Sequence, residues 1–299
     1  MDLDPELAAL RPLGGFFVLR TTAGARRPAA ALPPTLAQTY ATAATAATAA
    51  SAATAATAAP GTADGVTTAD GAARNALTSR VATVADRLRT GEARVAASIA
   101  HQGLAARLWS TALACAALYD RLPDLGPRLL RWDGAAPAPD DLWLTEVREA
   151  PGDPAGLADT VLHAHLRPLG EALTARYGVA ASLLWGNAGS ALAGAARELD
   201  RWARAHGRTD VADRARLLTD DLFAHPLLRT TGTRATTTRA TTTRTTATAT
   251  ATGTGTSTGT AAAFRRRSCC LYYRVPGGGI CGDCCFTRPP RSSPGGASG

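Results

Sequence analysis

The sequence predicts a mostly α-helical fold: a helical bundle with a small β-hairpin and a C-terminal cysteine-rich loop. Two observations lead to this prediction. Apolar residues recur every three or four positions through much of the stretch from 75 to 228, which is the spacing of one helix face. Five of the six cysteines lie close together at 269–285. The bundle is therefore expected in the middle of the chain, with the cysteines after it.

Low-complexity sequence divides the 299-residue chain into segments. Residues 41–59 are almost entirely Ala and Thr, residues 230–260 are dominated by Thr, and neither stretch repeats an apolar face. We expect linkers there, because such sequence buries too little apolar surface to fold. The predicted organisation is an N-terminal arm with an Ala/Thr linker at 1–74, a helical domain at 75–228, a Thr-rich linker at 229–263, a cysteine module at 264–286 and a flexible tail at 287–299.

The first half of the chain predicts an arm, a broken helix and a hairpin. The apolar piece at 16–19 predicts a strand or a docking arm. Residues 75–122 predict helix, with breaks near Gly91 and Gly103. Cys115 lies in the apolar stripe of this helix, so we expect it to be a small core residue. Strand-like runs at 129–133 and 142–144 flank a Pro/Gly/Ala loop and predict a hairpin.

Three further helices are predicted at about 154–177, 181–205 and 210–223, and Asp153 is a suitable cap for the first. His163 and His165 lie two residues apart on a helix and so point in different directions, which disfavours a shared metal. We expect His165 to be packed and His163 to be solvated. In the second helix, Gly186 permits close helix contact and Asn187 is suited to capping.

Charge and hydropathy limit the possible classes of protein. Residues 1–228 hold 22 arginines against 23 acids, whereas residues 229–299 hold ten arginines against Asp283 alone. No apolar run approaches the roughly 18 residues of a transmembrane segment, and the acidic start is unlike a secretory signal. We therefore expect a cytoplasmic protein, in which the cysteines stay reduced rather than forming disulfides.

Common catalytic motifs do not occur in the sequence. Gly277-Gly278-Gly279 lacks the Lys and Ser/Thr of a phosphate-binding loop, and neither Gly-x-Ser-x-Gly nor His-Glu-x-x-His is found. The acids are dispersed on amphipathic helices, which is typical of solvated faces. The chemistry is therefore expected in the cysteine segment.

The cysteine segment reads Cys269-Cys270, ten residues, then Cys281-x-x-Cys284. Residues 271–275 have strand composition, and the Pro and three Gly after them predict a turn that brings the two thiol pairs together. Structural zinc usually takes pairs of Cys-x₂₋₄-Cys, because the gap lets both sulfurs reach one ion. Adjacent cysteines suit a two-iron cluster better, since it offers two metal centres. The spacing favours the cluster and leaves zinc open.

The motif Cys-Cys-x₁₀-Cys-x₂-Cys resembles the cluster motif of the ferric-siderophore reductase family typified by FhuF. The flanking Arg-Arg-Ser-Cys-Cys-Leu-Tyr-Tyr and Pro-Gly-Gly-Gly-x-Cys-Gly-Asp-Cys are similar to its actinobacterial members. The resemblance is strong over 264–286 and weak over 75–228. It implies a 2Fe-2S cluster bound by four cysteines: Cys269, Cys270, Cys281 and Cys284. Cys285 departs from the family pattern, and we expect it to be neutral.

The resemblance implies an enzyme that reduces ferric siderophore complexes by one electron through the 2Fe-2S cluster and releases ferrous iron in the cytoplasm. No flavin or nicotinamide fingerprint occurs, so a separate electron donor is expected, a ferredoxin or a flavin reductase. The arginines at 265–267 and 274 either raise the cluster potential or form a solvated basic run. Tyr272 and Tyr273 are expected to pack.

Two other functions stay open. One is an iron-sulfur redox sensor or electron-transfer adaptor, in which the helices bind a partner. The other is a zinc-stabilised module that binds nucleic acid through the basic C-terminal region. Nucleic acid is the less expected partner, because the arginines of the Thr-rich tract have no interleaved aromatic residues.

Overall fold

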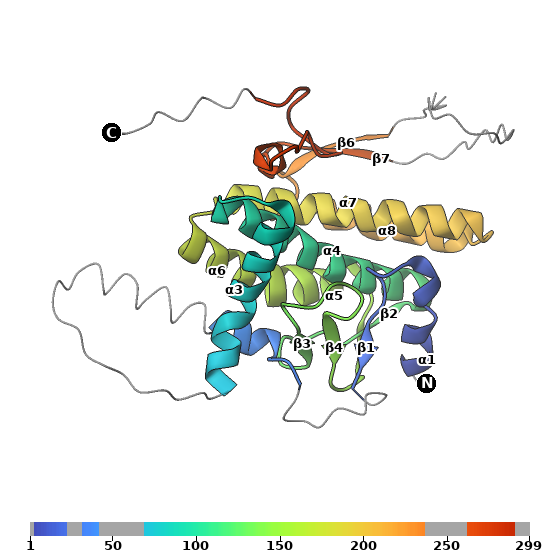
Figure 1. Ribbon diagram of the computed structural model, residues 1–299. Coiled ribbons are helices and arrows are strands. Elements are labelled where there is room, and N and C mark those ends of the chain that lie inside the picture. The colour runs from blue at the N-terminus through green and yellow to red at the C-terminus, as the bar shows by residue number, and fades with distance from the viewer. Residues whose placement is uncertain (1–2, 23–31, 42–68, 237–261, 291–299) are drawn as a thin grey trace, which may run out of the picture.

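The computed structural model describes residues 3–22, 32–41, 69–236 and 262–290 (Figure 1). Helices dominate these residues, which confirms the mostly α-helical prediction. None of the described helices combines the length and apolarity that a membrane crossing requires. The helical elements are α1 (Leu3–Ala8), η1 (Arg11–Leu13), α3 (Ala69–Leu88), α4 (Ala93–Tyr119), α5 (Pro154–Leu157), η3 (Ala158–Leu166), α6 (Arg167–Tyr177), α7 (Ala181–Ala205), α8 (Thr209–Ala224) and η4 (Tyr272–Arg274).

The strands are short and form three small sheets. They are β1 (Arg20–Thr21), β2 (Arg121–Pro123), β3 (Leu130–Trp132), β4 (Leu142–Leu144), β5 (Glu149–Pro151), β6 (Gly232–Thr236) and β7 (Ala262–Arg266). Antiparallel β3 and β4 are the predicted hairpin, and β1 adds to β4 in parallel, giving the order β1-β4-β3. The other sheets are the antiparallel pairs β2–β5 and β6–β7.

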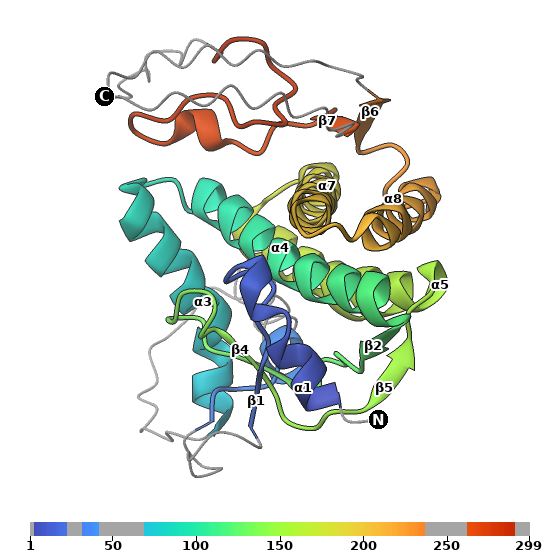
Figure 2. The ribbon, with the colours of Figure 1, turned by 90° about the vertical axis from the view of Figure 1, so that its right-hand side faces the viewer.

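The molecule is layered around α4 (Figures 1 and 2). Helices α7 and α8 cover one side of α4, and the N-terminal arm, α3 and strands β1 to β5 lie on the other. Most alanines along α4 are buried, and their small side chains allow the neighbouring helices to approach closely. The predicted break near Gly91 is confirmed, whereas Gly103 lies inside an unbroken helix, since its backbone accepts helical angles when tertiary packing supports them.

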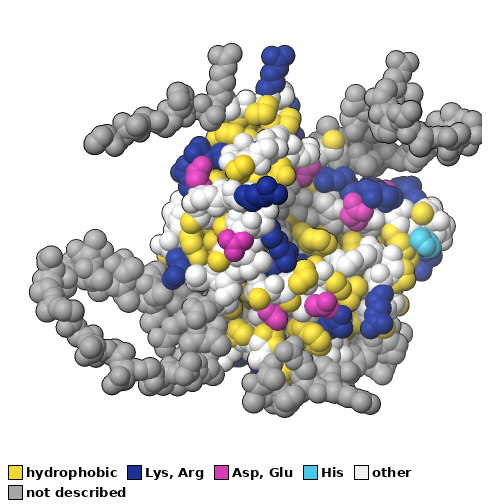
Figure 3. Space-filling model, in the orientation of Figure 1, with side chains coloured by type: hydrophobic (Ala, Val, Ile, Leu, Met, Phe, Trp, Pro, Cys, Tyr) yellow, Lys and Arg dark blue, Asp and Glu magenta, His cyan; other side chains and the backbone are white. Residues whose placement is uncertain are grey.

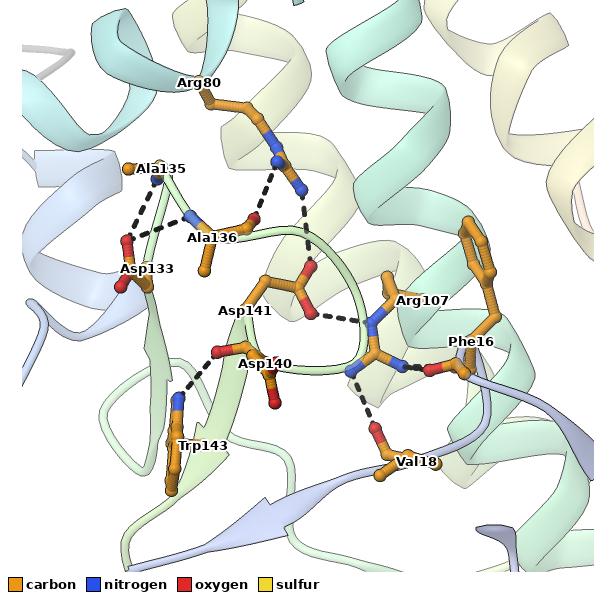
Figure 4. A network of polar contacts seen from close by, with 11 residues as sticks. Phe16, Val18, Arg80, Arg107, Asp133, Ala135, Ala136, Asp140, Asp141 and Trp143 are labelled. Carbon is orange, nitrogen blue, oxygen red and sulfur yellow. Dashed lines mark hydrogen bonds and ion pairs between the residues drawn. The ribbon is translucent and has the colours of Figure 1, made fainter. Parts of the chain in front are cut away.

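The buried Cys115 in α4 is a core residue, as predicted, and burial raises the pKa of its thiol to about 12. The N-terminal arm is held by another α4 residue (Figure 4). The Arg107 guanidinium binds Asp141 at 3.0 Å and donates to the backbone carbonyls of Gly15, Phe16 and Val18. Residues 16–19 are therefore a docked arm that leads into β1.

The predicted helix at 154–177 is continuous but changes pitch. Asp153 caps its start by accepting a hydrogen bond from the Gly156 amide at 2.7 Å, as predicted. The middle part, η3, is a π-helix that ends two residues before Pro168, a residue that has no N–H for the regular ladder. His165 is packed, with its ring bonded to the Tyr40 hydroxyl and the Leu125 carbonyl. His163 is not fully solvated, since it is half-buried with its ring 5.4 Å from that of His225.

Helices α7 and α8 match the predicted helices at 181–205 and 210–223 almost to the residue. Beyond them, β6 and β7 pair over the outer side of α7 (Figures 1 and 2). The ends of the predicted Thr-rich linker thus form a strand pair, whereas its middle, 237–261, lies outside the described residues. Nearly all of the predicted Ala/Thr linker, 42–59, lies outside them as well.

Candidate metal centre

Strand β7 packs on α7, so the cysteines that follow it in the chain lie at the surface of that helix. Phe264 of β7 is buried with its ring 5.2 Å from that of Phe223. Two glycines of α7 make the close approach possible: a Cβ at Gly189 would lie 2.6 Å from Thr231 Oγ1, and a Cβ at Gly186 would overlap Ser268 Oγ. Gly186 therefore serves contact with the cysteine segment rather than with another helix, which corrects the sequence-based interpretation.

The loop between the two cysteine pairs is a series of tight turns. The predicted strand at 271–275 is wrong, because Leu271 adopts φ +68° and residues 272–274 form the 3₁₀ turn η4. The glycine turn follows, with Gly277 at φ +70°, and a Cβ at Gly278 would lie 2.6 Å from the Tyr272 carbonyl oxygen. These turns return the chain within a few residues. They bring Cys270 Sγ to 3.4 Å from Cys281 Sγ, so the predicted meeting of the two pairs is found.

The remaining thiols lie around this contact. Cys270 and Cys284 are buried, whereas Cys269, Cys281 and Cys285 are half-buried, and all five interact electrostatically. Backbone amides donate to two of the sulfurs, Leu271 N–H to Cys269 at 3.2 Å and Phe286 N–H to Cys284 at 3.4 Å. Within the described residues, no three His, Cys, Asp or Glu side chains surround one ion position. A thiol-only donor set with N–H groups aimed at sulfur fits an iron-sulfur cluster.

The sulfurs differ in acidity. Their mutual hydrogen bond lowers the pKa of Cys270 to about 6 and raises the pKa of Cys281, because one proton serves both sulfurs. Burial raises the pKa of Cys269 to about 11 and also raises the pKa of Cys285. Cys270 is therefore the most readily ionised of these four thiols, and the thiolate is the form that binds metal.

A buried polar network connects the loop to two helices. Arg266 Nη1 donates to Asn187 Oδ1, and Asn187 Nδ2 donates to the Ser98 carbonyl at 2.9 Å and to its hydroxyl oxygen at 3.0 Å. The Ser98 hydroxyl in turn donates to the Cys270 carbonyl at 2.9 Å. The prediction that Asn187 caps a helix is wrong, because α7 begins at Ala181 and Asn187 lies inside it.

Asp283, between Cys281 and Cys284, fixes the second cysteine pair to α7. Ser190 Oγ donates to its carboxylate at 2.5 Å, and Arg197 Nη1 lies 3.3 Å from the other carboxylate oxygen. The Asp283 carbonyl accepts the Arg266 amide hydrogen at 2.9 Å. The anchoring roles of Asp283, Arg266 and Asn187 were missed from the sequence. The available signal was the strand period, which puts Arg266 on the same face as buried Phe264.

The outer side of the cysteine module carries both arginines and apolar groups (Figure 3). Arg265 donates to the Cys285 carbonyl at 3.0 Å, and Arg274 pairs with Glu92 at 2.7 Å. The Tyr273 ring lies 5.9 Å from that of Phe286, an aromatic contact within the module. Ile280 and Phe286 are 41% and 37% exposed, so the half-buried thiols lie beside a surface that a partner molecule can contact.

A helical domain with a thiol-only donor set on its outer face defines a metal-thiolate protein. Comparison with known families specifies it further. Residues 266–286 match the FhuF 2Fe-2S C-terminal domain, and residues 102–239 match the family described as ferric iron reductase FhuF-like transporter. Together the two matches span just over half of the chain. The chain therefore belongs to the FhuF-like family, and its cofactor is a 2Fe-2S cluster. No protein with a curated description matches it significantly.

Proposed function

We propose that this chain is a ferric-siderophore reductase that transfers one electron to the ferric complex, so that ferrous iron is released in the cytoplasm. The observation that carries the proposal is the cysteine module, which matches the family's 2Fe-2S domain and lies half-exposed on α7. When bound, the cluster supplies one-electron transfer without an open coordination position for substrate. The chain's own residues would hold it and shape its contact with the chelate.

The proposed ligands are Cys269, Cys270, Cys281 and Cys284. Two observations support this set. The sulfurs of Cys270 and Cys281, one from each half of the motif, are 3.4 Å apart. The Cys269 and Cys284 sulfurs each accept a backbone amide hydrogen, an arrangement that stabilises thiolates. Cys285 follows the motif and is proposed to be dispensable.

The substrate is proposed to approach the outer side of the module. The exposed Ile280 and Phe286 provide apolar contact for the organic part of a chelate beside the half-buried Cys281. Hydroxamate and catecholate oxygens are hard ligands that bind ferric ion far more tightly than ferrous ion. Reduction in place therefore weakens the complex and releases the iron. A separate ferredoxin or flavin reductase is proposed to supply the next electron to the oxidised cluster.

The test begins with protein isolated without oxygen. We expect iron and acid-labile sulfide in equal amounts, and visible absorbance that dithionite bleaches. Reduced protein is then mixed with ferric hydroxamate and ferric catecholate complexes in the presence of a coloured ferrous chelator, with the iron-free siderophores as control. The expected result is rapid reoxidation with one ferrous ion released per electron. Lack of reoxidation by every complex would reject the reductase and favour a sensor, and zinc without sulfide would reject the ligand set.

A further inference from the structure

We propose that Arg266, alone among the arginines at 265–267 and 274, is the positioning residue that raises the reduction potential of the cluster. It does so by holding a buried positive charge next to the sulfurs of Cys270 and Cys281. This inference rests on the proposed ligation of the cluster by these cysteines. It is independent of which iron complex is the substrate.

The environment of Arg266 requires a negative charge nearby. The residue is only 2% exposed, and its Nη1 bonds to the neutral Asn187 side chain. Its Nε and Nη2 atoms are buried without a hydrogen-bond partner. In the part of the chain that the structure describes, no carboxylate pairs with this guanidinium, and Asp283 directs its side chain to Ser190 and Arg197 instead. A buried cation with unsatisfied donors is costly unless an anion compensates it.

The sulfurs of Cys270 and Cys281 are the groups positioned to carry that anion. The guanidinium of Arg266 bonds to Asn187, which is linked through the Ser98 hydroxyl to the Cys270 carbonyl. The backbone amide of Arg266 donates to the carbonyl of Asp283, two residues after Cys281, at 2.9 Å. Arg266 is therefore fixed to both halves of the cysteine motif, and its own charge is buried and weakly screened.

The direction of the effect follows from charge. Four thiolates, two sulfides and two ferric ions carry a net charge of about −2, which becomes about −3 on reduction. A fixed cation stabilises the more negative state more strongly, so its presence raises the reduction potential. The network through Asn187 and Ser98 keeps the guanidinium in place, because Ser98 also binds the Cys270 carbonyl.

The neighbouring arginines lack these features. Arg265 and Arg267 point to the opposite face of β7 and are exposed, and the Arg265 guanidinium binds the Cys285 carbonyl. Arg274 is exposed and paired with Glu92. Water and salt screen exposed charges, so these three residues contribute little to the potential.

The test is a redox titration of the full chain with its cluster, followed by visible absorbance. We expect Arg266→Gln to lower the ratio of reduced to oxidised protein at a fixed applied potential about tenfold, a negative shift of about 59 mV for one electron. Arg266→Lys keeps the charge and should retain most of the wild-type potential. Arg267→Gln is the matched control one residue away, and its potential should stay close to that of the wild type.

A second variant keeps the inference testable if Arg266→Gln does not retain the cluster. Asn187→Asp preserves the size of the side chain and the oxygen that accepts from Arg266, but it pairs the guanidinium with a carboxylate and removes the two hydrogen bonds that Asn187 Nδ2 donates to Ser98, so the potential should again shift negatively. Unchanged potentials in the variants that retain the cluster would overturn the proposal, as would an equal shift in Arg267→Gln. If the wild-type protein contains no cluster at all, the proposed ligand set is what fails.

Discussion

Single residues of the same type have different surroundings in this protein, and the cysteines show it most clearly. Cys115 is enclosed among apolar side chains of α4, whereas the other five thiols interact with one another beside α7. The sequence separated these two groups correctly, because membership of a helical stripe and clustering in the chain are both local patterns. It could not single out Arg266 from its neighbours, since burial of that residue depends on distant Asn187.

At the ligand positions, serine substitution should remove the cluster. A serine hydroxyl is a poor ligand for iron at neutral pH compared with a thiolate, so we expect Cys281→Ser or Cys284→Ser to lose the native visible absorbance and the bound sulfide. Cys115→Ser and Cys285→Ser are the controls, and both should keep the full spectrum per folded molecule. Loss of absorbance in all four variants would contradict the proposed ligand set.

The buried histidines should make stability depend on pH. Burial lowers the pKa of His165 to about 4 and that of His101 to about 3, below the 6.5 of free imidazole. Between these values the unfolded chain binds protons that the folded chain excludes. The free energy of unfolding therefore falls as pH falls below about 6.5, by up to about 1.4 kcal/mol per pH unit for each histidine.

This dependence can be measured by urea unfolding at several pH values between about 7 and 5. His165→Gln should make the free energy of unfolding depend less steeply on pH, because the contribution of one buried histidine is removed. An identical slope in the wild type and in His165→Gln would show that folding does not lower the pKa of His165.

At the scale of elements, α7 supports the whole cysteine module. The helix was predictable because its apolar spacing is local, and its observed bounds match the prediction. Its contacts with β7 and the cysteine module were not predictable, since Gly186, Asn187 and Ser190 meet residues about 80 to 90 positions later in the chain. The turn at 272–274 was read as a strand because tyrosines favour strands, but the short distance between the thiol pairs requires a turn.

Close packing of α7 against the module predicts a position-specific effect of side-chain size. Gly189→Val should destabilise the protein by about 1–3 kcal/mol, because the added atoms collide with Thr231 and Phe264. Gly194→Val on the same helix is the matched control, since a Cβ there meets only Arg197 Nη2 at 3.9 Å. Urea unfolding of both variants checks this. Equal loss in the two variants would mean that helix propensity, not module packing, determines the change.

At the scale of the whole molecule, the cysteine module is the outermost layer over the helices (Figures 1 and 2). It is attached through β6 and β7, which pair in register from Gly232–Arg266 to Thr236–Ala262. The domain boundary predicted at 263/264 falls inside β7, and the predicted module omits the partner strand β6. Composition concealed that strand, because Thr-rich sequence has strand propensity without any apolar pattern to mark it.

The strand register predicts that residues 237–261 can be replaced. Thr236 is already the partner of Ala262, so a short turn containing Asn-Gly should connect the two strands without moving the module. Closing a shorter loop costs less entropy, and we expect the free energy of unfolding to rise by about 1–2 kcal/mol. The checks are urea unfolding and iron content. Loss of the cluster in a folded variant would show that the replaced residues help to hold it.

The contacts of Asp283 also bear on protein engineering. Asp283, which lies between Cys281 and Cys284, holds the second cysteine pair in place because its side chain binds Ser190 and Arg197 of α7. The Cys270 carbonyl is bound by Ser98 of α4. The segment 266–286 is thus not a portable peptide. A designer who wishes to graft this centre onto another scaffold must transplant the supporting faces of two helices along with the cysteines.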